Sequence, residues 1–478
     1  MSQVSIKKNF LYNASFQILL MIVPLITAPY VSRVLGPENI GIQSYTDSIV
    51  SYFVLFATCG LNMYGQREIA YHNSSVIEKS RIFWEVVVNK FVLTVFAIIC
   101  YLEFVSQTTE YRLVFMWQMI TLISCIFDIS WYYQGIQDFK NIVKRNVIVK
   151  LIGVACIFSF IHTSDDLILY IIILTGTTLL GNLILWLYMP NMLVQVPFKQ
   201  LHPFRDKRIK LELFAPFIAI QIYTVLDKTM IGLITNDVAQ NGYYEQSQKI
   251  VKMALGVITS LGTVLIPNIA EKFARHDYAG IRETAMKSFH FIILCACPMT
   301  CGLIAIAPVF VPWFFGPGYD EVVILLQIFS FLCVIIALSN IAGAGILTPI
   351  NKQNYGTLAT VAGAVTNFVL NLFLIQIYAA KGAAIASVIA ESMVTILHIY
   401  FIRKYVHVKI IVVWLKKYFP AAIFMGVMVY FSGGVLQMLQ MPGPVITIIQ
   451  LFLGALIYAI IVGKVFNEAD MIKRMMKR

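Results

Sequence analysis

The sequence is poor in charge. Only 13% of its 478 residues are Asp, Glu, Lys or Arg, whereas 59% are hydrophobic. A soluble domain carries about 25% charged residues, so this composition excludes a soluble globular protein and a disordered chain. It predicts an all-α integral membrane protein, because runs such as 171–174 are apolar at every position and lack the alternation of membrane strands.

Enzyme signatures are also missing. The sequence contains no GxxxxGK[ST] phosphate-binding loop, no HExxH zinc motif and no GxSxG nucleophile motif. Its seven His lack metal-ligand spacing, and its eight Cys all fall within apolar stretches, as buried hydrophobic residues do. The sequence therefore predicts a chain that is not an enzyme and that needs no metal or cofactor.

Apolar stretches long enough for a membrane helix, which needs roughly 20 residues, recur along the whole chain. We predict about fourteen, of which the fifth is short: 10–33, 41–66, 82–104, 111–134, 146–161, 167–190, 211–234, 243–267, 288–312, 321–347, 355–378, 381–402, 415–433 and 445–464. With both termini in the cytoplasm, 28 basic residues lie on inward segments, against Arg33, Arg112 and Lys381 outside. This asymmetry follows the positive-inside rule. It predicts a multi-pass membrane protein, and it accounts for the net charge of +12 without a nucleic-acid partner.

The longest polar segment between predicted spans is 191–210, with five basic residues. It predicts two six-helix lobes, 1–190 and 211–402, followed by two further helices and a basic tail in 403–478. A weak internal repeat at an offset of 201 supports the lobes; it joins Gly41, Ile49 and Val50 to Gly242, Ile250 and Val251. Two such repeats suit alternating access to a site between lobes.

Ionisable residues inside the predicted spans are the main functional signal, because each costs about 2.5–3.5 kcal/mol at a helix centre. They are Asp47, Lys90, Asp128, Lys150, Asp227, Lys228, Glu245, Lys249, Lys252 and Glu391. Lys90 and Lys150 lie near the inner ends of their spans, where snorkelling explains them. For Asp128 and Glu391 the alternative to a functional role is a buried hydrogen bond across helices.

Spans one, two, seven and eight carry the richest polar stripes. Asp47 shares a helix face with Ser44, Ser48 and Ser51, and Lys228 shares one with Thr224 and Gln221 beside Asp227. Glu245, Lys249 and Lys252 form a third stripe, in which Glu245 and Lys249 are spaced to pair. Several lysines facing a central space would attract an anion, and phosphate is the obvious one. The alternatives are helix packing by the Ser and Thr residues and snorkelling of the lysines.

Several segments resemble bacterial polysaccharide transporters, the repeat-unit flippases for O antigen and capsule in the multidrug/oligosaccharidyl-lipid/polysaccharide exporter superfamily. The resemblance extends from span one to about span twelve. The segments that carry it are 13–24, 30–45 (YVSRVLGPENIGIQSY), 64–70 (YGQREIA), 131–135 (WYYQG) and 226–232 (LDKTMIG).

This resemblance implies a V-shaped bundle with a central cavity and transfer of an undecaprenyl-diphosphate-linked oligosaccharide from the inner to the outer leaflet. It also implies that cavity cations engage the diphosphate, with Arg33, Asp227 and Lys228 as the functional positions carried over. The helical stripes add Asp47, Lys249 and Lys252 as candidate substrate-binding residues. Membrane lipids, and polymerase and chain-length proteins of the same pathway, are the expected partners. Coupling to protons or sodium through Asp47 or Asp227 is compatible with the sequence.

Three other functions compete with this one. A cation-coupled multidrug antiporter would call for unpaired acidic residues, whereas the stripes of spans seven and eight are net basic. A peptidoglycan lipid-precursor flippase shares the diphosphate chemistry and is poorly separated by residue pattern. A membrane polysaccharide polymerase or ligase would be an enzyme, and the short predicted outer loops argue against it.

Overall fold

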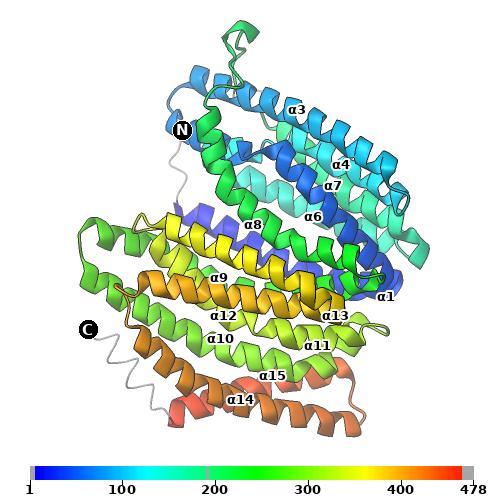
Figure 1. Cartoon of the computed structure of the whole chain (residues 1–478), viewed down its shortest axis with the longest axis vertical. Coiled ribbons are helices and arrows are strands. Elements are labelled where there is room, and N and C mark those ends of the chain that lie inside the picture. Colours follow the sequence, from blue (N-terminus) through cyan, green and yellow to red (C-terminus); the bar gives the residue numbers. More distant parts are fainter. Residues whose placement is uncertain (1–5, 190–192, 466–478) are drawn as a thin grey trace. The chain divides into compact units, whose positions relative to one another are not determined.

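The structure is a computed structural model that describes residues 6–189 and 193–465, and every regular element in these ranges is a helix. Figure 1 shows the α-helices, which are α1 (Ile6–Thr58), α2 (Leu61–Tyr71), α3 (Val76–Gln107), α4 (Arg112–Phe127), α5 (Ser130–Gly135), α6 (Phe139–Phe160), α7 (Leu167–Leu187), α8 (Lys207–Ile234), α9 (Ala239–Ala274), α10 (Tyr278–Phe315), α11 (Asp320–Ser330), α12 (Leu332–Asn340), α13 (Gln353–Ile402), α14 (Val408–Met438) and α15 (Gly443–Ile460). Four short 3-10 or π elements complete the list: η1 (Ser164–Asp166), η2 (Phe198–Gln200), η3 (Ile341–Leu347) and η4 (Ile461–Val465). The basic tail predicted at the end of the chain lies largely outside the described residues.

All fourteen predicted stretches fall on helical segments. The first stretch, and the second as far as Thr58, form the two halves of α1, which bends at Gly36 with φ 76° and ψ 170°. The second predicted stretch is too long, because the chain turns at Cys59 and Gly60 and its last residues belong to α2. Gly36 adopts this positive φ readily because it has no Cβ. The eleventh and twelfth stretches form α13, with a similar break at Ala379. The fifth is not short: α6 has 22 residues.

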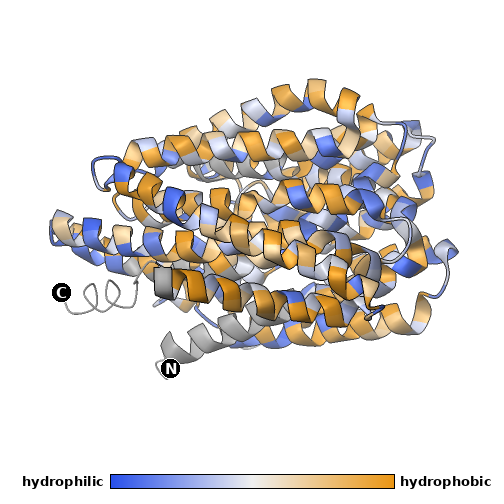
Figure 2. Ribbon diagram, turned by 90° about the horizontal axis from the view of Figure 1, so that it is seen from below, coloured by the Kyte–Doolittle hydropathy of each residue, from blue (hydrophilic) through white to orange (hydrophobic). Residues whose placement is uncertain are grey.

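Within the described residues, nine helical segments are long and apolar enough to cross a membrane. Many large apolar side chains on these helices are exposed, among them Phe96 on α3, Phe373 on α13 and Phe452 on α15, at 66%, 64% and 75%. Figure 2 shows the hydrophobic residues distributed along the helices. Exposed apolar surface of this extent would aggregate in water, and it fits a hydrocarbon environment. The chain is therefore an all-helical, multi-pass membrane protein.

The described helices form two compact units. The first extends to Leu233 and includes 237–242, and the second comprises 234–236 and the chain from Tyr243 onward. Helix α8 belongs to the first unit, as does the predicted linker 191–210. In the second unit α10 packs against α11, α12, α14 and α15, and α13 packs against α11 and α12. The division into lobes at 191–210 stays a prediction.

The polar linker is bound to the surface of the first unit. The carboxylate of Glu85 on α3, only 3% exposed, accepts a hydrogen bond from the backbone N–H of His202 (3.1 Å) and lies 3.3 Å from Nε of Arg205. Asn89, one turn further along α3, donates to the carbonyl of Pro203 (2.9 Å). Lys210 donates to the same carbonyl (2.7 Å). The segment that leads into α8 therefore has a defined path across α3.

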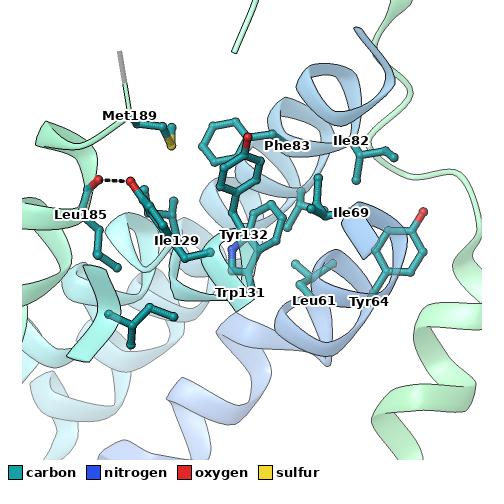
Figure 3. Close-up of a cluster of buried hydrophobic side chains, with 13 residues drawn as sticks. Leu61, Tyr64, Ile69, Ile82, Phe83, Ile129, Trp131, Tyr132, Leu185 and Met189 are labelled. Atoms are coloured by element: carbon teal, nitrogen blue, oxygen red, sulfur yellow. Dashed lines mark hydrogen bonds between the residues drawn. The ribbon is translucent and has the colours of Figure 1, made fainter. Parts of the chain in front are cut away.

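Two of the segments that carry the family resemblance pack against each other. Tyr64 and Gly65 lie on α2 and Trp131 lies on α5. Figure 3 shows Tyr64 and Trp131 in one buried cluster. Trp131 stacks on Phe83 with ring centroids 5.6 Å apart. A Cβ at Gly65 would overlap the Trp131 indole, so glycine at this position permits the close approach of α2 and α5.

The expectation that Lys90 snorkels to the membrane surface is wrong. Its side chain does not snorkel: it is 1% exposed, donates to Asn62 Oδ1 (2.9 Å) and the Asp128 carbonyl (2.8 Å), and lies 3.5 Å from Asp128 Oδ2. Asn62 also donates to Asp128 Oδ2 (3.1 Å), which is the cross-helix hydrogen bond that was the alternative to a functional role for Asp128. Ser130 donates its N–H (3.0 Å) and hydroxyl (2.6 Å) to Oδ1. This network joins α2, α3 and the break between α4 and α5. Lys150 is exposed on α6, as the snorkelling hypothesis expects.

Gly65→Ala tests the contact of α2 with α5. We expect it to destabilise the purified protein by about 1–3 kcal/mol, because the new methyl group must displace a fully buried indole. The measurement is the thermal unfolding midpoint in detergent. Gly176→Ala on α7, where a Cβ would meet nothing within 4 Å, is the matched control and should leave the midpoint unchanged. Equal midpoints for the two variants would contradict the tight contact.

A double-mutant cycle on Lys90 and Asp128 tests the buried network. Lys90→Met should destabilise the protein by about 3–5 kcal/mol, because it leaves a buried carboxylate without its cation. The double variant Lys90→Met with Asp128→Asn should lose less stability, measured by thermal unfolding in detergent, than the sum of the losses in the two single variants. Lys287→Met is the control, since Lys287 pairs with Glu283 at an exposed site and such pairs contribute little. Additive effects would refute the pairing.

Candidate functional site

The second half of α1 and the second half of α8 lie side by side in the first unit. Ser48 Oγ is 2.8 Å from Thr229 Oγ1, which also donates to the hydroxyl of Tyr52 (3.1 Å). Gly232 faces Tyr45 so closely that a Cβ there would overlap the tyrosine ring. Small and hydroxyl-bearing residues let membrane helices approach and hydrogen-bond, and they hold this helix pair together.

Three of the predicted substrate-binding residues lie on this pair. Asp227, on α8, is buried at 5% exposure, and Lys228 beside it is half-buried. Asp47, on α1, is also half-buried, and its backbone carbonyl accepts a hydrogen bond from Ser51 (2.8 Å). The pair therefore carries two carboxylates and one ammonium within an apolar bundle. Arg33 lies apart from them: it is exposed and precedes the bend at Gly36.

The glycines of the internal repeat meet inside the first unit. Gly41 lies on α1 after the bend, and Gly242 lies in the first turn of α9. A Cβ on Gly41 would overlap the carbonyl of Val238, and one on Gly242 would overlap the carbonyl of Pro37. The repeat found in the sequence thus marks a point where two chain segments touch, and only glycine fits on both sides of it.

The remaining two predicted residues lie on α9, in the second unit. Lys249 is 3.5 Å from Glu245 Oε1, so the pairing expected from their spacing is confirmed. Lys252 is exposed. The hydroxyl of Tyr244, on the same helix, is 3.2 Å from Ser387 Oγ on α13. Whether Lys249 and Lys252 share a cavity with Lys228 stays a prediction.

The structure adds two features that sequence reasoning missed. For the network of Lys90 and Asp128, the sequence offers only one signal, an opposite charge on each of two consecutive predicted spans. A hollow of about 640 Å³ lies at the bend of α1, lined by residues that include Glu38, Asn39 and Asp165. Asn39 spans it by donating to the carbonyl of Ser164 (2.8 Å). Its two carboxylates make it a poor site for phosphate.

The arrangement suits binding and movement of a charged group more than catalysis. Among the described side chains, His, Cys, Asp and Glu do not gather in threes as metal ligands would. An ammonium group inside an apolar bundle is a strong attractor for an anion, because low dielectric magnifies its field. Of the three candidate lysines, Lys228 is the one that lies in the first unit, where it is half-buried on α8.

Comparisons with known proteins identify the family of the chain. The family model described as "Polysaccharide biosynthesis protein" matches residues 6–273. The Escherichia coli (strain K12) protein named "Putative O-antigen transporter" is 26% identical over 84% of this chain and 98% of its own length. "Lipid II flippase MurJ" of Bacillus subtilis is 26% identical over 38% of this chain and 36% of its own length.

Solved structures agree on the fold. The inward closed conformation of the lipid II flippase MurJ matches 97% of this chain and 100% of its own, with a TM-score of 0.75 at 15% identity. An inward-facing multidrug resistance MATE transporter of the MOP superfamily matches 85% of this chain and 99% of its own, with a TM-score of 0.65 at 12% identity. All of these proteins are named as transporters or flippases, not as enzymes. The chain belongs to the polysaccharide biosynthesis protein family of membrane transporters, and its fold is that of the MurJ and MATE proteins.

Proposed function

We propose that this protein is a flippase that moves an undecaprenyl-diphosphate-linked oligosaccharide from the inner to the outer leaflet of the bacterial cytoplasmic membrane. The product would serve O-antigen, capsule or exopolysaccharide biosynthesis. The family match and the O-antigen transporter relatives support this assignment. The observation that carries it is the half-buried Lys228, beside the buried Asp227, on the polar helix pair of the first unit.

The physical problem is the diphosphate. A bare charge in hydrocarbon is very costly, so the head group cannot cross the bilayer unaided. Lys228, Lys249, Lys252 and Arg33 would supply cations along a wet path, while the polyprenyl tail stays in lipid. Lysine suits this role because its ammonium is a mobile point charge that releases phosphate more readily than a bidentate guanidinium.

The proposed topology has fourteen spans, with two six-helix lobes, two C-terminal helices and both termini in the cytoplasm. The positive-inside distribution of 28 basic residues against three supports this orientation. Rocking of the lobes in a V-shaped bundle would expose the cavity to alternate sides. Polymerase and chain-length proteins of the same pathway would receive the product.

A peptidoglycan-precursor flippase is the second candidate, because the fold of MurJ matches nearly the whole chain. Its substrate has the same diphosphate chemistry, so competition between the two lipids separates the candidates. A multidrug antiporter fits less well, since the candidate set has four cations against Asp47 and Asp227.

Lys228→Ala should reduce transfer of a labelled undecaprenyl-diphosphate oligosaccharide between leaflets of proteoliposomes by at least about tenfold. That ratio corresponds to about 1.4 kcal/mol, a modest share of the interaction between an ammonium and a phosphate. Lys228→Arg should retain part of the rate because it keeps the charge. Lys150→Ala, which removes an exposed lysine from α6, should leave the rate unchanged. An equal loss in Lys150→Ala and Lys228→Ala would overturn the specific role of Lys228.

Asp227→Asn tests ion coupling. If Asp227 carries the coupling proton or sodium ion, the neutral amide should abolish the acceleration of transfer by an imposed ion gradient while leaving gradient-free transfer measurable. Asp165→Asn, which changes an exposed carboxylate in the hollow at the bend of α1, should keep the gradient response. The assay compares initial rates with and without a gradient of pH or sodium. A full gradient response in Asp227→Asn would assign coupling to another residue.

A further inference from the structure

The C-terminal hairpin of α14 and α15 has a one-sided charge. Between Glu391 and Glu468 the sequence has no Asp or Glu, yet it has six basic residues: Arg403, Lys404, Lys409, Lys416, Lys417 and Lys464. Positive-inside topology accounts for an excess of Lys and Arg, but acidic residues are largely indifferent to that rule. Within the spans the cost of burying a carboxylate explains this absence, but at the ends of the hairpin, where charge is tolerated, every charged residue is basic. This one-sided charge favours an anionic neighbour.

A hollow in the second unit lies beside two of these lysines. It has a volume of about 470 Å³ and is lined by Lys416, Lys417, Pro420, Ala421, Phe424 and Ile461. Lys416 is exposed, and Phe424 is 55% exposed. The hollow is thus lined by two lysines and by apolar side chains. The ammonium of Lys417 lies 5.4 Å from the ring centroid of Tyr418.

The order of these residues along α14 matches the depth profile of a lipid leaflet. α14 begins at Val408, after the basic loop that the proposed topology places in the cytoplasm. Lys416 and Lys417 would lie at the level of the inner-leaflet head groups. Phe424 lies about two turns, roughly 12 Å, deeper. Ile461, at the end of α15, returns to the same side of the hairpin and closes the apolar part of the hollow.

We propose that this hollow is a binding site for an anionic phospholipid of the inner leaflet. The phosphodiester would lie between the ammonium groups of Lys416 and Lys417, and the start of an acyl chain would pack on Pro420, Phe424 and Ile461. Basic pockets between membrane helices on the cytoplasmic side bind anionic head groups in this way. The shallow, surface-level position suits a lipid that stays in its leaflet, whereas a transported lipid must leave it. The inference goes beyond the proposed function and takes from it only the membrane orientation.

Native mass spectrometry of the delipidated full-length protein tests the site without any transport step. The probes are dioleoyl phosphatidylglycerol and dioleoyl phosphatidylcholine, added to the protein in mild detergent. The wild type should bind the first phosphatidylglycerol at least about tenfold more tightly than phosphatidylcholine, and Lys416→Gln with Lys417→Gln should remove most of that preference. The control is Lys140→Gln with Lys199→Gln, which removes two exposed lysines of the first unit and should keep the preference.

Two further arms identify the ligand. Phe424→Ser should weaken phosphatidylglycerol binding by several-fold, because the acyl chain loses its floor. Competition by inorganic phosphate at the lipid's concentration would overturn the proposal in favour of a simple anion site. Stronger binding of undecaprenyl diphosphate than of phosphatidylglycerol through the same lysines would overturn it in favour of a substrate-docking site. An equal loss in the control pair would show non-specific attraction and would also overturn it. These binding measurements do not depend on transport, so they can be interpreted even if the protein fails the flippase assay.

Discussion

A charge inside hydrocarbon must be compensated, and this constraint organises the structure. The ammonium of Lys90 lies among Asn62 and the carbonyl and carboxylate of Asp128. Because those groups come from three helical regions, compensating one charge also fixes the break between α4 and α5 against α2 and α3. The packed cluster of Gly65, Phe83 and Trp131 forms on the same helices. The polar network and the aromatic cluster thus depend on one another.

The same constraint separates structural charges from candidate functional ones. Lys90 is fully enclosed and hydrogen-bonded, which leaves its ammonium unavailable to a substrate. Lys228 is half-buried on a helix that contacts α1 through Ser48, Tyr52 and Thr229. The proposed flippase would need cations that, unlike Lys90, can meet the phosphates of its substrate. Lys416 and Lys417, which line a hollow with apolar residues, would form a third kind, at the level of the lipid head groups.

Much of the fold could be predicted because a long apolar run in the sequence indicates a membrane helix without any knowledge of its neighbours. The helical character of the predicted stretches follows from hydropathy. The pairing of Glu245 with Lys249 follows from local spacing. The pairing of Lys90 with Asp128 does not, because the two residues are 38 positions apart and no local spacing relates them. Taken alone, Lys90 suggests snorkelling, and Asp128 suggests a functional role or a hydrogen bond to a helix that its own span does not identify. The contact between Gly65 and Trp131 could not be predicted either, because the two residues are far apart in the sequence and nothing in their segments indicates that they pack together. How the six candidate residues combine into one cavity stays a prediction.

The central claim is that the transported group is recognised through its diphosphate. The most direct measurement is leaflet transfer by the wild type in proteoliposomes of two labelled lipids. They share the glycan and the undecaprenyl tail, and one has the diphosphate while the other has a neutral linkage of similar length. The account predicts rapid transfer of the diphosphate lipid and background transfer of the neutral lipid. Equal transfer of both lipids would contradict it and would assign recognition to the glycan or the tail.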